Sequence, residues 1–292
     1  MKPGRATLRP SSGYIDRAVL PRPTWAAPLS SLRTLLGKER QRDLPGSVPP
    51  AMPELARHQG TIMAARGTLR LVRAQGEALA RYAGRALWPA ARASVGRDPA
   101  FDPETRSWFA GQLEHIRSYL EYGAGASTLL AADRGIAAIS IESDARYARQ
   151  VREALPADLG KYIVTIDIGV TEDWGYPLWV LPTRGTRRRW QRYPLAGPAH
   201  LDRLPVFPEL VLIDGRFRVA SCLAMARAAT ERAASTQILF DDYSLRPHYH
   251  AIEAIIGRPE KIGRAALFRV GNTALDLKAL DSAIDGAVRD YR

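Results

Sequence analysis

Cysteine, lysine and long apolar segments are scarce in this sequence of 292 residues. The single cysteine, Cys222, can form neither an internal disulfide nor a cysteine zinc cluster, so the chain is compatible with a reducing cytoplasm. No run of 18 or more apolar residues is present, and no apolar core follows the basic residues at the N-terminus. These absences predict a soluble, cytoplasmic protein without a membrane span or a secretory signal.

Acidic residues are also scarce, but only in the first part of the chain. Residues 1–110 contain 18 Lys and Arg against 8 Asp and Glu, whereas residues 111–292 contain 24 against 22. The formal net charge of +12 therefore belongs mostly to the N-terminal part. Arginine greatly outnumbers lysine, as is also typical of GC-rich genomes, so basicity alone does not indicate nucleic-acid binding.

Three segments follow from composition and periodicity. Residues 1–53, rich in Pro, Ser, Arg and Gly, are predicted to be extended or disordered. Residues 54–101 carry apolar side chains at helical spacing with arginines elsewhere, which predicts a basic amphipathic helix. This helix is expected to pack on the following domain or on a second subunit, and the alternative is peripheral contact with the anionic inner membrane face or another polyanion.

Residues 102–292 are predicted to form the folded α/β domain. Asp102, Pro103 and Glu104 give a helix start with a cap, a proline and an acid in the first turn. Apolar runs at 119–121, 137–142, 161–167, 209–214 and 236–241 then alternate with helices that begin near residues 127, 144, 216 and 246. Such alternation indicates a doubly wound, mainly parallel sheet.

The turn after the first of these strands is rich in glycine. In Glu121-Tyr-Gly-Ala-Gly-Ala-Ser127, two glycines let peptide N–H groups approach a ligand at the start of a helix. Glu142 ends the next strand about 20 residues after the turn, where the ribose diol of a nucleotide needs an acceptor. A dinucleotide site prefers a third glycine where Thr128 stands, and Glu121 would repel pyrophosphate. The pattern therefore favours an adenosine-bearing cofactor that is cationic or carries an amino group.

This E-x-G-x-G-x-S pattern resembles the first motif of class I S-adenosylmethionine-dependent methyltransferases. The element order agrees over residues 103–292, and residues 119–146, 209–220 and 237–243 match closely. The resemblance implies a Rossmann-like sheet of seven strands, in which apolar runs at 265–270 and 274–277 form the closing antiparallel pair. It also implies S-adenosylmethionine as the cofactor, with a binding set made of Glu121, Gly123, Gly125, Ser127, Glu142, Asp167 and Trp174. Trp174 is expected either to stack on the adenine or to anchor its loop in the core.

Acidic residues end two further predicted strands. Asp214 follows the fourth strand, and Asp241 and Asp242 follow the fifth, so parallel pairing brings them together at one edge of the sheet. Carboxylate oxygens suit Mg²⁺ or Ca²⁺. The arrangement resembles metal-dependent O-methyltransferases related to catechol O-methyltransferase, although that family usually has Asp-Asn at the second site. The resemblance implies that a metal lowers the pKa of a substrate hydroxyl; the alternative is that these acids only cap turns and helices.

Basic residues near these acids are candidates for substrate binding. Arg216 and Arg218 follow Asp214, and we expect Arg216 to hold an acidic group of the substrate, or these arginines to pair with the acids. Residues 184–193, rich in arginine, are expected to form a basic loop that is either a substrate lid or simply exposed. His248 is a candidate base.

The expected function is methylation of a hydroxyl on a small or saccharide-type substrate. Nucleic-acid methylation is an alternative, but the fourth strand ends in Ile213-Asp-Gly-Arg rather than the Asn/Asp-Pro-Pro-Tyr typical of enzymes that methylate base amines. The other alternative is a catalytically degenerate methyltransferase fold that docks to a membrane surface or a protein partner. The sequence does not indicate the oligomeric state.

Overall fold

The computed structural model of the protein describes residues 72–73, 75–80, 82–83, 95–179, 181, 183–271 and 274–291. All of them belong to one compact unit, Leu69–Arg292. The extended segment predicted at 1–53 lies outside the described residues, as does most of the basic helix predicted at 54–101. Residues 75–80 within that segment are helical. None of the described helices has the length and apolar composition that a membrane crossing requires.

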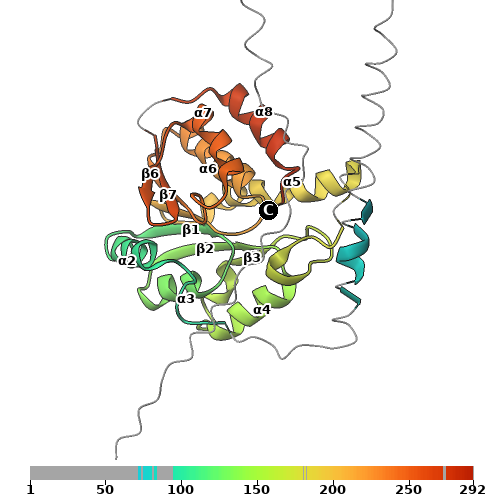
Figure 1. Cartoon of the computed structure of the whole chain (residues 1–292). Helices are drawn as coiled ribbons and strands as arrows, with labels where there is room; N and C mark the ends of the chain where they lie inside the picture. The colour runs from blue at the N-terminus through green and yellow to red at the C-terminus, as the bar shows by residue number, and fades with distance from the viewer. Residues whose placement is uncertain are drawn as a thin grey trace, which may run out of the picture. The chain divides into compact units, whose positions relative to one another are not determined.

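A single sheet of seven strands forms the centre of the described unit (Figure 1). The strands are β1 (Ser118–Tyr122), β2 (Ala137–Glu142), β3 (Ile163–Thr165), β4 (Leu210–Ile213), β5 (Thr236–Phe240), β6 (Glu260–Ile262) and β7 (Ala265–Val270). Their order is β3-β2-β1-β4-β5-β7-β6, with β1 to β5 parallel and β7 antiparallel to both neighbours. The structure confirms the predicted doubly wound, Rossmann-like sheet.

The central strands are apolar because helices cover both of their faces. Every residue of β4 is buried, and so is every residue of β1, although β1 includes an acid, Glu121. A strand that is buried on both faces gains nothing from alternating polar positions, so its sequence is a continuous apolar run. The exception at Glu121 therefore requires a specific set of hydrogen-bond donors.

Helices form a layer on each face of the sheet (Figure 1). One layer contains α2 (Pro103–Gln112), α3 (Ala126–Asp133) and α4 (Ala145–Ala154). The other contains α5 (Arg184–Ala199), α6 (Arg218–Glu231), α7 (Glu253–Ile256) and α8 (Leu277–Ala287). The predicted start of α2 is confirmed, because the Asp102 carboxylate accepts hydrogen bonds from the backbone N–H groups of Glu104 and Thr105.

Two sequence predictions were wrong about local structure. The closing antiparallel pair is β6 and β7, whereas the run predicted as a strand at 274–277 leads into α8. Asp276 accepts from two backbone N–H groups there and caps the helix. The basic loop predicted at 184–193 is instead the first part of α5, which Thr183 caps. In both places a helix cap decides the structure: Thr183 precedes the segment 184–193, and Asp276 lies within the run 274–277.

Candidate functional site

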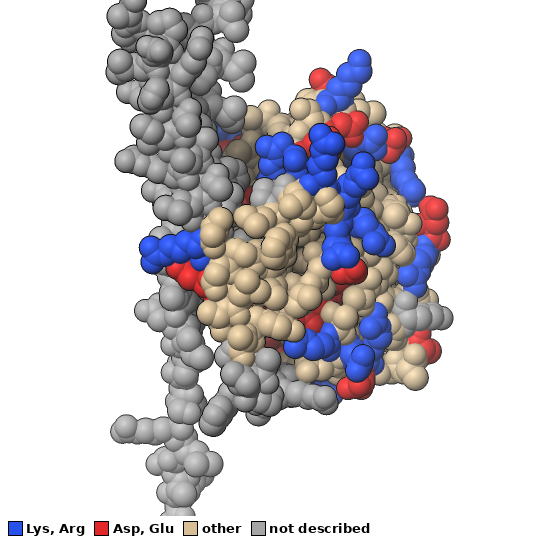
Figure 2. All heavy atoms as spheres, turned by 90° about the vertical axis from the view of Figure 1, so that its right-hand side faces the viewer, with Lys and Arg blue, Asp and Glu red and all other residues tan. Residues whose placement is uncertain are grey.

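The turns that follow the parallel strands meet at one edge of the sheet. Figure 2 faces the side on which these strands end, and basic side chains gather on it around a few acidic ones. The N-terminal turns of α5 reach this side in Figure 1, and they carry exposed arginines, including Arg188 and Arg192. Most of the charged side chains on this side are therefore basic, beside a broad uncharged area.

The glycine turn after β1 packs tightly against the turn after β4. Gly123 has a φ of 98°, and a Cβ atom built on it would lie 2.8 Å from the backbone nitrogen of Gly215. Its own N–H donates to the carbonyl oxygen of Ile141, in β2, over 2.8 Å. Glycine is required here both for the backbone angle and for the close approach. The turn is thus held beside the carboxyl end of β2.

Glu121 is fully buried and binds four hydroxyl groups. Its carboxylate accepts from Tyr119 over 2.9 Å, from Ser127 and Ser140 over 2.5 Å each, and also from Thr128. Burial raises the pKa of Glu121, and these hydrogen bonds oppose the rise. The structure brings Glu121 and Ser127 together as predicted, but in a network that joins β1, β2 and α3. Their contact with a cofactor stays a prediction.

Thr128 explains why a third glycine is not needed in this motif. Its hydroxyl oxygen accepts from the backbone N–H of Gly125 over 2.9 Å, which caps the start of α3. Tyr147, in α4, was missed by the sequence analysis, and a Cβ atom on Gly125 would lie 3.2 Å from its hydroxyl oxygen. Burial and then the negative charges of Glu142 and Glu121 raise the pKa of Tyr147. A phenol therefore covers the glycine turn, among the carboxylates.

Glu142 ends β2 with one oxygen fixed and the other available. Its Oε1 accepts from the backbone N–H groups of Ser143, over 2.6 Å, and Asp144, over 2.8 Å. No described residue hydrogen-bonds to its Oε2. The side chain is buried, which raises its pKa. Two backbone donors therefore orient this carboxylate, and Oε2 retains its capacity to accept a hydrogen bond from a hydroxyl group.

Residues 170–178 form a hairpin that lies over Glu142. Two backbone hydrogen bonds, of 2.7 and 2.8 Å, close this 170–178 hairpin. A Cβ atom on Gly175 would lie 2.6 Å from Ser143 Oγ and 3.6 Å from Glu142 Oε1. Trp174, beside it, is 79% exposed and has a φ of 61°. The alternative of a core role for Trp174 is therefore wrong, and its stacking on adenine stays a prediction.

Asp167 follows β3 and is mostly exposed. Its carboxylate accepts from the backbone N–H of Gly169 over 2.8 Å and lies 3.6 Å from Nε of Arg189, in α5. A cavity of about 450 Å³ begins at the next residue and is lined by Ile168, Gly169, Val170, Leu178, Trp179, Gly185, Thr186 and Arg189. Asp167 thus lies at the rim of an apolar cavity, and its contact with a cofactor stays a prediction.

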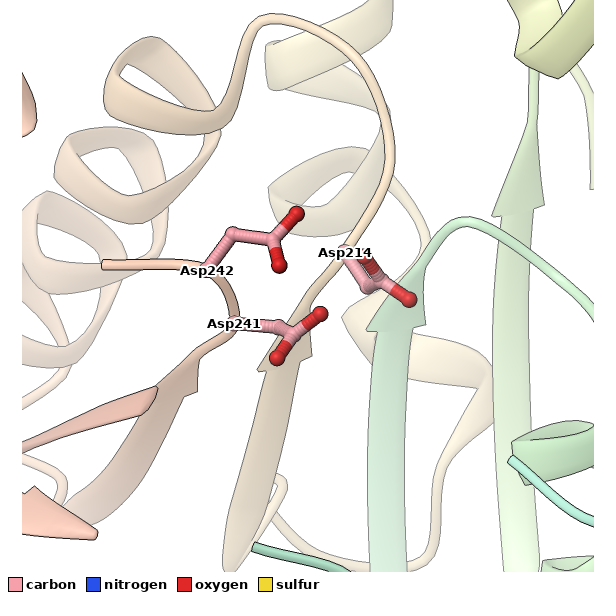
Figure 3. A group of neighbouring side chains, drawn as sticks. All are labelled: Asp214, Asp241 and Asp242. Atoms are coloured by element: carbon pink, nitrogen blue, oxygen red, sulfur yellow. The ribbon is translucent and has the colours of Figure 1, made fainter. Parts of the chain in front are cut away.

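The three acids predicted to converge after β4 and β5 do so. One carboxylate oxygen from each of Asp214, Asp241 and Asp242 lies within 4.8 Å of the others (Figure 3). Asp241 and Asp242 are buried, whereas the side chain of Asp214 is 35% exposed. Burial and the two neighbouring acids raise the pKa of Asp214 to about 7, against the opposing charge of Arg218. The sequence therefore located the acid cluster correctly.

Three arginines bind these acids, and the sequence analysis had placed only Arg218 among them. Arg264, in the β6–β7 turn, donates from Nε and Nη2 to the two oxygens of Asp241, over 3.1 Å each. Arg218, which begins α6, donates from Nη2 to Asp214 Oδ1 over 2.7 Å. Further ion pairs to Asp242 come from Arg246 at 3.0 Å, Arg264 at 3.1 Å and Arg218 at 3.4 Å. The pairing predicted for Arg216 and Arg218 is thus formed by Arg218.

The residues present do not fit a divalent metal ion. Three guanidinium groups balance three carboxylates, and Arg218, only 3% exposed, lies between Asp214 and Asp242. A metal would have to displace buried ion pairs whose partners would then be left without a counter-charge. We therefore derive no chemical step through a metal at this cluster.

His248 contacts Asp290 and Tyr249. Its Nε2 lies 3.9 Å from a carboxylate oxygen of Asp290, near the C-terminus, and its ring packs against Tyr249 at a centroid distance of 4.3 Å. These contacts orient the imidazole toward the C-terminal segment. The structure does not bring His248 to Asp214, and its role as a base stays a prediction.

The sheet order, the glycine turn after β1 and the acid that ends β2 define a Rossmann-like methyltransferase fold. Among solved structures, the chain is similar to a methyltransferase-like protein from Silicibacter pomeroyi, with 33% sequence identity and a TM-score of 0.55. The similarity covers 66% of this chain and 97% of that protein. No protein-family model and no curated protein matches the sequence. The chain therefore belongs to the family of this methyltransferase-like protein.

Proposed function

We propose that the protein is an S-adenosylmethionine-dependent methyltransferase that acts on a hydroxyl group of a small or saccharide-type acceptor. The observation that carries the proposal is the position of Glu142. Its oriented carboxylate lies beside the glycine turn, and Oε2 has no hydrogen-bond partner among the described residues. A ribose diol supplies the two hydroxyl donors that such a carboxylate accepts. The family relationship supports the same class of activity.

Asp214 is the side chain best placed to take a proton from the acceptor. Arg218 holds its Oδ1, while no described residue hydrogen-bonds to Oδ2, and the side chain is partly exposed. S-adenosylmethionine held at Glu142 would supply an electrophilic methyl group to the acceptor oxygen, with the sulfur of the cofactor as the leaving group. Asp214 Oδ2 accepts the proton that the hydroxyl loses. A base whose pKa lies near the working pH is effective in this role.

Calorimetry with S-adenosylhomocysteine tests the cofactor assignment. We expect the wild-type protein to bind it and Glu142→Gln to bind about 10- to 100-fold more weakly, because a hydrogen bond to a charged acceptor is worth about 1.5–3 kcal/mol. Glu153→Gln is the matched control, since Glu153 is an exposed acid on α4. A folded wild-type protein that does not bind at millimolar ligand, or a Glu142→Gln variant with unchanged affinity, would refute the proposal.

A further inference from the structure

Four arginines lie near the ends of β4 and β5, and one of them differs from the rest. Arg218, Arg246 and Arg264 each form ion pairs with the acid cluster. Arg216 is only 5% exposed, yet it forms no ion pair with any described residue. Its Nε and Nη1 are buried and have no hydrogen-bond partner among the described residues. A buried guanidinium group with unmade hydrogen bonds is costly, so it requires a specific explanation.

The surroundings of Arg216 hold its side chain without using its Nε and Nη1 donors. The guanidinium carbon lies 4.1 Å from the ring centroid of Tyr176, in the 170–178 hairpin. A Cβ atom on Gly175 would lie 3.8 Å from Arg216 Cγ. Burial alone would raise the pKa of Tyr176, but the positive charges of nearby arginines, with Arg216 foremost, lower it below its usual value. The hairpin thus holds the guanidinium group against Tyr176, while Nε and Nη1 have no hydrogen-bond partner among the described residues.

The nearest acids do not supply the missing partner. Asp214 already forms an ion pair with Arg218, at 2.7 Å. The Glu142 carboxylate accepts hydrogen bonds from two backbone N–H groups. Burial raises the pKa of Asp214 and the positive charge of Arg216 opposes this rise, but Arg216 forms no ion pair with either carboxylate. The fork of a guanidinium group matches the two oxygens of a carboxylate or phosphate, and a ligand anion would satisfy both unpaired nitrogens.

We propose that Arg216 binds an anionic oxygen group of a ligand beneath the 170–178 hairpin. This inference rests on the proposed function, and two sources provide the chemistry. One is the carboxylate in the amino-acid part of the cofactor, and the other is an acidic group on the acceptor, such as the carboxylate of a uronic acid. Either ligand places a negative group within the same site as the diol acceptor Glu142.

Binding measurements on Arg216→Gln distinguish the two sources. S-adenosylhomocysteine and 5′-methylthioadenosine share the nucleoside, but only the first has the carboxylate. If the cofactor supplies the anion, Arg216→Gln loses about tenfold or more in affinity for S-adenosylhomocysteine and retains its affinity for 5′-methylthioadenosine. If the acceptor supplies it, both nucleoside affinities are unchanged. Glucuronate or inorganic phosphate then raises the melting temperature of the wild-type protein with S-adenosylhomocysteine bound, and Arg216→Gln abolishes that rise.

Controls separate this inference from the proposed function and from a purely structural role. Arg134→Gln removes an exposed arginine at the end of α3 opposite the glycine turn, and this variant should match the wild type in every measurement. Arg216→Lys keeps the charge without the fork and should retain only part of the affinity. The inference is overturned if Arg216→Gln changes neither carboxylate-dependent measurement, or weakens both nucleosides equally. If the wild-type protein binds neither nucleoside, the proposed function fails. Arg216 is then tested by the rise in melting temperature that glucuronate or phosphate causes without nucleoside, compared between the wild type and Arg216→Gln.

Discussion

Glu121 and Glu142 flank the glycine turn, but the structure gives them different surroundings, and a stability measurement distinguishes their roles. Glu121 has no exposed surface and accepts hydrogen bonds from four hydroxyl groups. We expect Glu121→Ala to destabilise the fold strongly, because it leaves those hydroxyls buried without their common acceptor. Glu142→Gln is expected to weaken ligand binding with little change in stability.

The magnitude follows from the Glu121 network. Each unmade buried hydrogen bond costs about 1–3 kcal/mol, but two of the four donors, Ser140 and Thr128, lie 3.4 Å apart and can partly satisfy each other. Removal of the carboxylate also recovers the cost of its burial, which is the reason for its raised pKa. The net loss is therefore about 3 kcal/mol, at the lower end of the range for a broken buried charge network. In a unit of this size the melting temperature should fall by about 6–12 °C.

Thermal and urea unfolding followed by circular dichroism measure this loss, with Glu153→Ala as the exposed control. The raised pKa of Glu121 adds a pH dependence whose sign is fixed. The stability that it contributes is complete below the unfolded-state pKa and is lost as the pH rises through the folded-state value. The stability advantage of the wild type over Glu121→Gln should therefore shrink as the pH rises above the unfolded-state pKa of a glutamate. A Glu121→Ala variant that keeps the wild-type melting temperature but loses affinity for S-adenosylhomocysteine would refute the structural role of Glu121 and support a role in cofactor binding.

Two further predictions concern the acid cluster. Because the pKa of Asp214 is raised to about 7, its basic form accumulates as the pH rises through that value, so kcat/KM should reach half of its maximum near pH 7 and level off at higher pH. Asp214→Asn should lose about 10²- to 10⁴-fold in kcat, and its kcat/KM should no longer rise with pH when labelled cofactor is followed into product. An unchanged rise with pH would show that another group is the base. Because three arginines bind the three acids, excess chelator should leave turnover unchanged, and millimolar Mg²⁺ should give no binding heat. Loss of turnover that Mg²⁺ restores would show instead that Asp241 and Asp242 bind a metal.

Features that depend on strand order were predictable from the sequence, because parallel strands end at one edge of the sheet. This reasoning placed Asp214 beside Asp241 and Asp242, and the structure agrees. The partners of these acids were not predictable in the same way. Arg264 lies 23 residues beyond Asp241, in a hairpin turn whose position depends on how β6 and β7 close the sheet. Pattern reasoning finds residues at strand ends more easily than residues that a distant turn brings to them.

Motif reasoning had a different limit at the glycine turn. The spacing of Glu121 and Glu142 predicted two acids near one ligand, but periodicity gives no information on which hydroxyls fill the space between strands. Ser140 points from β2 to Glu121, and this cross-strand contact makes the first acid part of the scaffold. The serine is visible in the sequence two residues before Glu142. An acid within an otherwise apolar buried strand, opposite a serine, is the signal that was available.

The balance of charge at the sheet edge narrows the kind of ligand that fits. The acid cluster and its three arginines are mutually neutral, and Glu121 is bound by hydroxyls, so these groups attract little from outside. Apart from Asp214 Oδ2, which we assign to the acceptor's proton, Glu142 and Arg216 have hydrogen-bonding capacity that no described residue uses. A ligand that fits both offers hydroxyl donors to the carboxylate and an anionic acceptor to the guanidinium. A nucleoside with an amino-acid side chain has both groups on one molecule. A nucleoside bound together with an acidic acceptor has them on two molecules. In either case, Glu142→Gln and Arg216→Gln should affect different parts of what the site binds.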